Sequence, residues 1–260
     1  MGDNRVAIVT GAAGGIGRAI ARRLARDGLH VTVSDLESKQ RQLDQIAGEI
    51  AEFGVRSHAV TADVSDADSV GRMVTTTVDE LGGLDVMVAN AGIVTPVPLL
   101  DLSTQEWDRV MSVNARGTLL CYQAAARQLI RQGRGGKIIG AASVAAHQSS
   151  ALVGHYSASK FAVRSLTQAA ALEWAEHGIT VNAYSPGLVH TTMWDDLDEE
   201  IVSLQGGEPG DVIRSAVPEI PLGRVQRPED VAGLVSYLAS HDADYMTGQS
   251  VIIDGGMLLG

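Results

Sequence analysis

The sequence predicts an α/β fold, in which a doubly wound parallel sheet of about seven strands carries helices on both faces. Short apolar runs recur along the chain, and segments of helical length separate them. The runs are apolar almost throughout, as expected for strands buried on both sides of a parallel sheet. We see no linker, low-complexity segment or internal repeat, so we expect one domain over residues 1–260.

Seven apolar runs are the predicted strands. In chain order they are VAIVT (6–10), HVTVSD (30–35), SHAVTAD (57–63), LDVMVAN (84–90), GKIIGAAS (136–143), ITVNAYS (179–185) and SVIID (250–254). An alanine- and arginine-rich stretch that ends near Asp27 follows the first run, and a polar stretch near 38–53 follows the second. Residues 156–175 carry apolar side chains at helical spacing, which predicts a helix before the sixth strand.

The charge balance limits the classes of partner. The chain has 20 Lys and Arg against 31 Asp and Glu, a net charge of −11, and no basic cluster interrupts it. Nucleic acid and an anionic membrane surface are therefore not expected partners. No apolar run approaches the roughly 18 residues of a membrane span, and glycines follow the first run too soon for a signal peptide.

Cysteine and histidine usage bounds the compartment and the metal chemistry. Cys121 is the single cysteine, so no intrachain disulfide can form, and this fits a reducing compartment. We therefore expect a cytoplasmic protein. The seven histidines show no metal-ligand spacing with cysteine or carboxylates, so we expect no metal site.

Residues 186–227 break the alternation of strands and helices and are rich in proline and glycine. Long excursions of this kind in compact domains are often lids, and we expect a substrate lid at about 188–220. The acidic run DDLDEE (195–200) lies within it. We interpret this run as a solvent-exposed helix start rather than a metal site.

The segment TGAAGGIG, residues 10–17, lies between the first strand and the first helix. Glycines here let a phosphate approach the backbone, and the N-terminus of the new helix offers free N–H groups to it. The second strand ends in Asp35, whose carboxylate can accept hydrogen bonds from both ribose hydroxyls and would repel a 2′-phosphate. The pattern predicts a dinucleotide site. A glycine turn that serves only tight packing is the alternative.

The glycine spacing of residues 10–17 resembles that of the short-chain dehydrogenase/reductase family. The resemblance extends over essentially the whole chain and implies a Rossmann-like fold. Further matching motifs are ANAG (89–92), with Ala89 where a first Asn is common, and PGLVHTTM (186–193). Four residues match the family's catalytic tetrad: Asn114, Ser143, Tyr156 and Lys160.

The resemblance implies a nicotinamide dinucleotide as cofactor. The implied cofactor-binding residues are Gly11, Gly15, Ile16, Gly17, Asp35, Leu36, Asp63, Val64, Asn90, Gly92, Tyr156, Lys160, Pro186, Gly187, Val189 and Thr191. Family members that use NADPH often carry Arg or Lys in the glycine turn or just after the second strand, whereas this chain has Ala12, Ala13 and Leu36 there. We therefore expect NAD. For Asp63, the alternative is an acid at the N-terminus of the following helix.

Tyr156 and Lys160 are four residues apart and share one face if residues 156–175 are helical. Hydride transfer from an alcohol needs a group that takes the hydroxyl proton, and a tyrosine with an ordinary pKa near 10 is a poor base. Lowering that pKa to about 7 takes about 4 kcal/mol. A cation about 4–5 Å away, at an effective dielectric of about 20, supplies roughly 3–4 kcal/mol. Lys160, helped by positively charged oxidised nicotinamide, is therefore sufficient.

The resemblance implies roles for the other two residues of the tetrad. Ser143 would hydrogen-bond the reacting oxygen, and Lys160 would also bind the nicotinamide ribose. Asn114 would hold a water that relays protons from Lys160 to solvent. An asparagine that only kinks a helix is the alternative for Asn114.

Residues 156–194 and 221–258 resemble the 2,3-butanediol dehydrogenases and acetoin (diacetyl) reductases within the family. The implied substrates are 2,3-butanediol and acetoin, with reduction of diacetyl. The implied substrate-binding residues are Ser143, Val144, Ser150, Tyr156, Gly187 and Trp194. Family members are usually tetramers, so the resemblance also implies a homotetramer.

Three alternatives for the function stay open. The nearest is a sugar-alcohol dehydrogenase of the sorbitol or galactitol type. A 3-oxoacyl carrier-protein reductase ranks lower because Asp35 disfavours NADPH. A catalytically silent NAD-binding regulator belongs to a different class, and the intact tetrad argues against it.

Overall fold

The computed structural model of the chain describes residues 5–259. Within that range, seven parallel strands form one sheet in the order β3-β2-β1-β4-β5-β6-β7. Their bounds are β1 Val6–Thr10, β2 His30–Asp35, β3 Ser57–Thr61, β4 Val86–Ala89, β5 Gly136–Ala141, β6 Ile179–Pro186 and β7 Ser250–Ile253. The strand order reverses between β1 and β4. Open α/β sheets bind ligands at such a switch point, outside the carboxyl ends of the strands.

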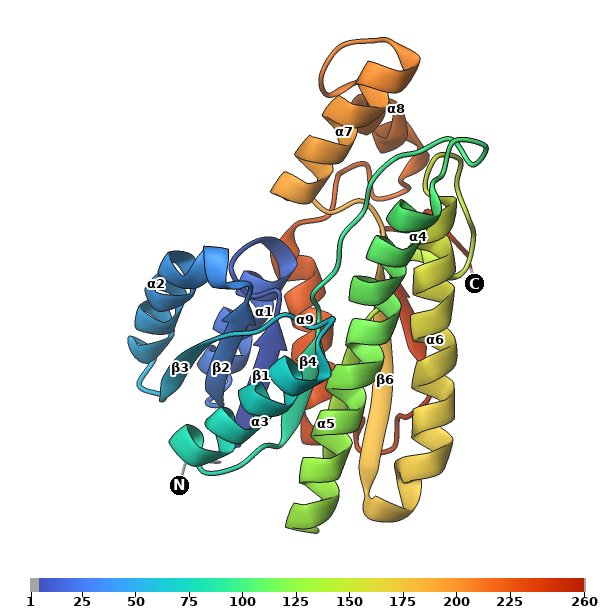
Figure 1. Cartoon of the computed structure of the whole chain (residues 1–260). Coiled ribbons are helices and arrows are strands. Elements are labelled where there is room, and N and C mark those ends of the chain that lie inside the picture. The colour runs from blue at the N-terminus through green and yellow to red at the C-terminus, as the bar shows by residue number, and fades with distance from the viewer. Residues whose placement is uncertain (1–4, 260) are drawn as a thin grey trace.

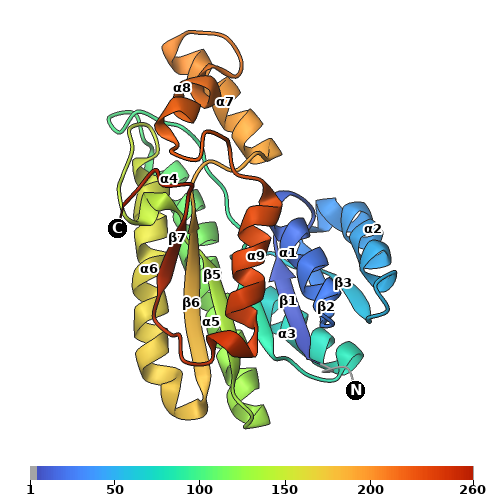
Figure 2. The ribbon, with the colours of Figure 1, turned by 180° about the vertical axis from the view of Figure 1, so that it is seen from behind.

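Helices cover both faces of the sheet. Figure 1 shows α3, α5 and α6 over one face, and Figure 2 shows α1 and α9 over the other. The helix bounds are α1 Gly15–Arg26, α2 Gln40–Ala51, α3 Ala67–Leu81, α4 Thr104–Met111, α5 Gly117–Gln132, α6 Gly154–Trp174, α7 Thr192–Gln205, α8 Asp211–Ala216 and α9 Pro228–Ala239. α7 and α8 project beyond the carboxyl ends of the strands, at the top of Figure 1.

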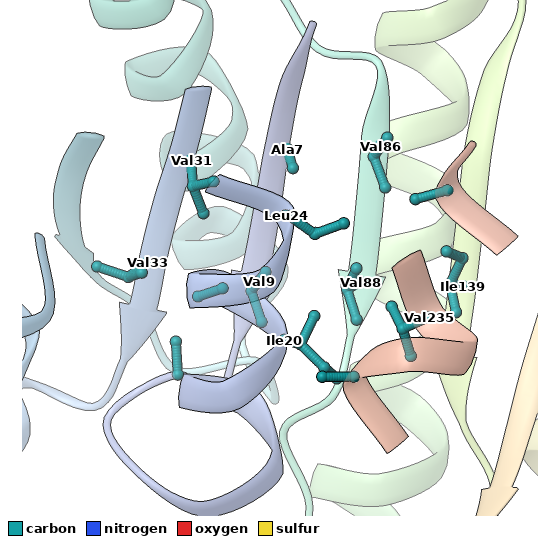
Figure 3. Close-up of a cluster of buried hydrophobic side chains, with 14 of the residues drawn as sticks. Ala7, Val9, Ile20, Leu24, Val31, Val33, Val86, Val88, Ile139 and Val235 are labelled. Carbon is teal, nitrogen blue, oxygen red and sulfur yellow. The ribbon is translucent and has the colours of Figure 1, made fainter. Parts of the chain in front are cut away.

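Alternate residues of the central strands point into two separate apolar clusters. Val86 and Val88 of β4 belong to the cluster under α1 and α9, whereas Met87 belongs to the cluster under α3 and α5. Figure 3 shows Ile20 of α1 and Val235 of α9 meeting the strands in the first cluster. Burial of each such side chain contributes about 1.5–3 kcal/mol. The sheet is thus buried on both sides, as the continuous apolar runs predicted.

The predicted fold class is confirmed. The seven predicted strands correspond to β1–β7, and the helix predicted over 156–175 is α6. The irregular region 186–227 contains the end of β6, α7, α8 and a short 3-10 turn. Among the described residues, no helix combines the length and apolarity that crossing a membrane requires.

Candidate active site

The turn between β1 and α1 contains two kinds of glycine. Gly11 has a φ of +64°, and a Cβ there would lie 2.9 Å from Nδ2 of Asn90. A Cβ on Gly17 would lie 2.6 Å from the same nitrogen and 2.2 Å from the carbonyl oxygen of Gly11. Gly14 is exposed, and a Cβ there would meet nothing within 4 Å. Two of the glycines therefore make room for the protein's own Asn90, and Gly14 faces open space.

The beginning of α1 fits the phosphate groups of a dinucleotide. α1 begins at Gly15, and no side chain caps its N-terminus. The first N–H groups of a helix have no partner within the helix, and together with the helix dipole they favour an anion. The side chain of Ile16 packs against the apolar cluster under α1, which anchors this first turn. A Cβ on Gly15 would lie 3.2 Å from Cγ2 of Thr191, so the segment after β6 approaches the turn closely.

Asn90, directly after β4, joins that strand to the glycine turn. Its Nδ2 donates to the carbonyl oxygens of Thr10 at 2.8 Å and Gly11 at 3.2 Å. Its Oδ1 accepts from the hydroxyl of Tyr184 at 2.7 Å. Oγ1 of Thr10 accepts from the backbone N–H groups of Asn90 and Ala91 at 3.0 and 3.1 Å. Both amide hydrogens and the amide oxygen of Asn90 are therefore engaged within the protein, and its side chain shapes the turn.

Asp35, at the end of β2, lies beside the same turn. Its Oδ2 accepts from the backbone N–H of Ala13 at 3.1 Å, and its Oδ1 accepts from that of Leu36 at 2.9 Å. The carboxylate is therefore fixed at the rim of the predicted dinucleotide site. The Leu36 side chain beside it is 49% exposed and carries no charge.

Asp63 and Val64 follow β3. Asp63 is exposed, and its Oδ1 accepts from the backbone N–H of Ser65 at 2.9 Å and from its hydroxyl at 2.7 Å. The N-cap of α3 is Asp66, whose side chain accepts two backbone N–H groups. The alternative interpretation of Asp63 as the helix N-terminal acid is therefore wrong. Val64 is buried, and a Cβ on Gly117 would lie 2.9 Å from its Cγ2, so Val64 packs closely against α5.

Ser143, Tyr156 and Lys160 meet at the carboxyl end of β5. Ser143 lies just past that strand, where its Oγ accepts from the backbone N–H of Ala145 at 3.1 Å and lies near enough to the hydroxyl of Tyr156 to influence its pKa. Tyr156 and Lys160 come from the first two turns of α6. Nζ of Lys160 donates to the carbonyl oxygen of Ala141 at 2.8 Å and lies 5.4 Å from the centroid of the Tyr156 ring.

Burial dominates the electrostatics of this group. Burial raises the pKa of Tyr156 above its ordinary value, and the hydrogen bond with Ser143 opposes that shift. Burial also lowers the pKa of Lys160 to about 8. Burial thus disfavours the charged form of both side chains, although a pKa of about 8 still leaves Lys160 mostly protonated at neutral pH. We had expected Lys160 to lower the pKa of Tyr156. That expectation omitted the free-energy cost of removing water from the charged side chains.

Asn114 lies in a π-helical turn between α4 and α5. Its Nδ2 donates to the carbonyl oxygen of Ile93 at 2.8 Å and to Oγ of Ser159 at 3.0 Å, and its Oδ1 accepts from the N–H of Ile93 at 2.9 Å. A Cβ on Gly92 would lie 3.3 Å from Oδ1 of Asn114 and 3.4 Å from Nζ of Lys160. Gly92 therefore allows these two side chains to approach the segment after β4. Single π turns inside helices are frequent at functional sites.

The segment from Pro186, the last residue of β6, to Thr191 contains four predicted cofactor residues. A Cβ on Gly187 would lie 2.9 Å from Cβ of Asp254, the residue after β7, so only a glycine fits at this close approach. Val189 is buried and pairs with Gln226 in an isolated bridge. Thr191 is the N-cap residue of α7. The predicted cofactor residues of this segment are thus held between the end of β7 and the glycine turn.

The predicted substrate residues are less tightly arranged. Val144 is half-buried directly beside Ser143, and Trp194 is half-buried in the first turn of α7. Ser150 is exposed, and no hydrogen bond within residues 5–259 joins it to the predicted catalytic residues. The same loop contains Leu152, whose φ of +66° is unusual for a residue with a side chain.

Asp198, in the acidic run of the predicted lid, is a correction to the sequence interpretation. The run was expected to be a solvent-exposed helix start, but Asp198 is only 3% exposed. Its carboxylate accepts from the backbone N–H groups of Gly210, Val212 at 3.0 Å and Ile213 at 3.4 Å. These N–H groups lie at the beginning of α8, where the helix dipole also favours an anion. Asp198 therefore joins α8 to α7.

Sequence reasoning missed three residues that hydrogen-bond predicted site residues or their neighbours. They are Thr10, Ser159 and Tyr184. Thr10 was visible as the first residue of the glycine motif, but its bonds to the residues after β4 were not. Tyr184 gave a weak signal, as the one aromatic side chain in the sixth predicted strand. Ser159 gave none, because a serine inside a helix usually faces solvent.

Comparison with known proteins supports the motif-based resemblance. The family model described as "Enoyl-(Acyl carrier protein) reductase" matches residues 11–258. The chain is 47% identical over 256 residues to a "Diacetyl reductase [(S)-acetoin forming]" of Staphylococcus epidermidis, covering 98% of this chain and 99% of that one. It is 44% identical to an "L-2,3-butanediol dehydrogenase" of Corynebacterium glutamicum, with coverages of 98% and 99%. A "Sorbitol dehydrogenase" of Cereibacter sphaeroides is 39% identical, with coverages of 98% and 97%.

Proposed function

The chain belongs to the short-chain dehydrogenase/reductase family, and from this premise we propose that it interconverts 2,3-butanediol and acetoin and reduces diacetyl, with NAD(H) as cofactor. It is an oxidoreductase that acts on CH–OH donors and uses a nicotinamide cofactor. The observation that carries the proposal is the meeting of Ser143, Tyr156 and Lys160 at the carboxyl end of β5, beside the switch point of the sheet.

The proposed chemistry is proton transfer by Tyr156 coupled to hydride transfer. A nicotinamide dinucleotide bound beside this group would supply the hydride acceptor for oxidation of the alcohol and the hydride donor for reduction of the ketone. In the oxidation direction Tyr156 takes the hydroxyl proton, and in the reduction direction it donates that proton to the carbonyl oxygen. Ser143 donates a hydrogen bond to the reacting oxygen and holds it near Tyr156. Transfer of the hydride to the cofactor and of the proton to Tyr156 would account for both hydrogens that the alcohol loses when it becomes a ketone.

Lys160 makes the proton transfer possible near neutral pH. In the protein alone Tyr156 keeps its proton, because burial raises its pKa, whereas a pKa of about 8 leaves Lys160 mostly protonated at neutral pH. The positive charge of oxidised nicotinamide and a protonated Lys160 would together favour the phenolate of Tyr156. Both amide hydrogens of Asn114 are donated, to Ile93 and Ser159, and its backbone carbonyl accepts from the hydroxyl of Thr118 at 2.7 Å, so a relaying water would bind as a donor to a remaining lone pair of an Asn114 oxygen.

Asp35 supports NAD over NADP. Its carboxylate is fixed beside the glycine turn by two backbone N–H groups, and neither Ala13 nor Leu36 supplies a cation. A 2′-phosphate in that place would meet a negative charge with no compensation. Turnover measured with each cofactor tests the assignment. Equal or better efficiency with NADPH would remove it.

The substrate is proposed from the relatives. The similarity is higher to the diacetyl reductase and the butanediol dehydrogenase, at 47% and 44% identity, than to the sorbitol dehydrogenase, at 39%. A screen of NADH oxidation against diacetyl, both acetoin enantiomers, ketohexoses and a β-ketoester separates the candidates. We expect diacetyl and one acetoin enantiomer to be reduced fastest. Preference for a ketohexose would favour the sugar-alcohol alternative, and no oxidation with any carbonyl would favour a binding protein without turnover.

We further propose that the chain is one domain with a lid at about 188–220, and that it works as a cytoplasmic homotetramer. α7 and α8 project over the carboxyl ends of the strands, which supports a lid (Figure 1). Usual tetramer formation within the family supports the assembly state. Light scattering on the purified protein tests it, and a monomer mass at micromolar concentration would contradict it.

A further inference from the structure

Tyr184 of β6 lies level with Asn90 across the sheet. Ala89, the last residue of β4, pairs with Gly140, and Ala141 pairs with Tyr184. Asn90 follows Ala89, so Asn90, Ala141 and Tyr184 occupy one level of three neighbouring strands. Ala141 and Tyr184 belong to the same buried cluster. The small side chain of Ala141 lets the Tyr184 hydroxyl reach across β5 to Oδ1 of Asn90, at 2.7 Å.

The direction of this hydrogen bond is fixed by the partners of Asn90. Both hydrogens of Nδ2 are donated to carbonyl oxygens, those of Thr10 and Gly11, which can only accept. The hydroxyl of Tyr184 must therefore donate to Oδ1. Tyr184 is 1% exposed, and burial raises its pKa, so this hydroxyl keeps its proton.

Without the hydroxyl, the amide of Asn90 would lose its orientation. Its oxygen would be buried without a donor, and rotation of the amide would place that oxygen against two carbonyl oxygens. The two glycines that make room for Nδ2, Gly11 and Gly17, are part of the turn at the beginning of α1. A change in the amide is therefore transmitted directly to the backbone of that turn.

We propose that Tyr184 is a positioning residue for the dinucleotide: its hydroxyl orients the Asn90 amide, which holds the glycine turn in the shape that accepts the phosphates. The inference rests on the proposed function and extends it to a residue at the far side of β5 from the turn. The same level of the sheet also serves Lys160, because the carbonyl oxygen of Ala141 accepts from its Nζ at 2.8 Å. One row of residues thus connects the glycine turn with the predicted catalytic lysine.

Tyr122 offers a matched control. It is also 1% exposed, and its hydroxyl also has a single side-chain partner, Oγ1 of Thr167 at 2.9 Å. It belongs to the cluster on the opposite face of the sheet, between α5 and α6, away from the glycine turn. Tyr122→Phe therefore removes the same hydroxyl from an equally buried position without touching Asn90.

The test is the dissociation constant for NADH, measured by fluorescence titration of the wild type, Tyr184→Phe and Tyr122→Phe. We expect Tyr184→Phe to bind NADH about fivefold more weakly, as loss of one buried hydrogen bond implies, and Tyr122→Phe to bind as the wild type does. The turnover number at saturating NADH should be unchanged in Tyr184→Phe, with the defect confined to KM for NADH. Equal NADH affinities for the two variants would overturn the inference. A wild type that binds no NADH would instead overturn the proposed function.

A double-mutant cycle tests whether Tyr184 acts through Asn90. In an Asn90→Ala background, Tyr184→Phe should cause no further loss of NADH affinity, and additive losses would overturn the inference. If Tyr184→Phe does not fold, Asn90→Asp examines the same chain of bonds from its other end. That change keeps the acceptor for Tyr184 but replaces both amide donors with an oxygen, so NADH binding should weaken at least tenfold. Wild-type affinity in Asn90→Asp would overturn the inference.

Discussion

The two sides of the candidate active site are built in different ways. On the dinucleotide side, around the ends of β1, β2 and β4, Thr10 accepts two N–H groups, and the Asn90 amide makes three hydrogen bonds. On the lid side, the loop with Ser150 is exposed, and Leu152 has an unfavourable positive φ. The lid helices α7 and α8 are joined mainly to each other, by Asp198.

The difference follows from what each side must do. A dinucleotide is held in the same pose for either direction of the reaction, so pre-organised donors and acceptors improve binding without later rearrangement. A small ketone must enter and leave at every turnover, which requires elements of low local stability. We infer that substitutions on the dinucleotide side change cofactor binding or chemistry strongly, whereas those on the lid side change substrate KM moderately.

Tyr156→Phe should give the largest effect of all. The phenyl ring fills the same space but can neither take nor donate the proton, so turnover of acetoin should fall about a thousandfold or more. NADH should still bind, because the change removes one hydroxyl and leaves the other implied cofactor-binding residues in place. Steady-state kinetics and NADH fluorescence titration measure the two quantities. Retention of more than a few per cent of activity would show that another group moves the proton.

Lys160 makes the stability of the fold depend on pH, and this tests how strongly its side chain, beside the end of β5, is desolvated. Its pKa falls from 10.5 to about 8 on folding, so between these values the unfolded chain binds more protons than the folded chain. Stability therefore rises with pH in that window, by about 2 kcal/mol between pH 7.5 and 9.5 for this group alone. Lys160→Met should lack this contribution.

Comparing Lys160→Met with the wild type cancels the contribution that other titrating groups make to the pH dependence of stability. Burial raises the pKa of Cys121 to about 12, and it also raises that of Tyr122, so both groups lower stability at high pH in either protein. Urea unfolding at several pH values gives the two curves. Parallel curves for variant and wild type would contradict a buried, desolvated Lys160.

Asp35→Asn should shift the cofactor preference. The substitution keeps one acceptor oxygen for the backbone but removes the charge, so efficiency with NAD should fall about tenfold and efficiency with NADP should rise. Glu37→Gln, two residues along the chain and exposed, removes the same charge from a position without a contact to the glycine turn. The ratio of kcat/KM for the two cofactors is the measurement. Equal shifts in both variants would mean that only the general negative potential matters.

The sequence predicted the dinucleotide side because its determinants are local. Apolar runs gave the strands, and a glycine turn between a strand and a helix gave the position of α1. The approach of Tyr156 and Lys160 followed from their four-residue spacing on a helix. The chain of bonds from Tyr184 to Asn90 could not be predicted, because it depends on the registers of three neighbouring strands.

The sequence argument also left out the effect of burying charged groups. The sequence argument considered the attraction between Tyr156 and Lys160 but not the loss of water around them, and desolvation reverses the direction of the Tyr156 pKa shift. In the same way, the acidic run 195–200 has the composition of an exposed surface. Only the return of the chain at α8 brings backbone N–H groups to one of its members, Asp198.

Asp198→Ala should give the smallest effect, and one confined to the lid side. Removing the carboxylate leaves the N–H groups at the beginning of α8 without their acceptor, and a buried donor without a partner costs about 1–3 kcal/mol. Because α7 carries Trp194 next to the predicted substrate, a loosened lid should raise KM for diacetyl about fivefold. The dissociation constant for NADH should not change, since Asp198 contacts no residue of the glycine turn.

Asp196→Ala is the matched control for this prediction. Asp196 belongs to the same acidic run but is exposed, so its removal changes the charge of α7 by the same amount and breaks no buried hydrogen bond. If KM for diacetyl rises equally in both variants, the effect comes from charge and not from the joint between α7 and α8. If Asp198→Ala weakens NADH binding as much as Tyr184→Phe does, the lid is part of the dinucleotide side. The distinction between a pre-organised dinucleotide side and a separate lid side would then be wrong.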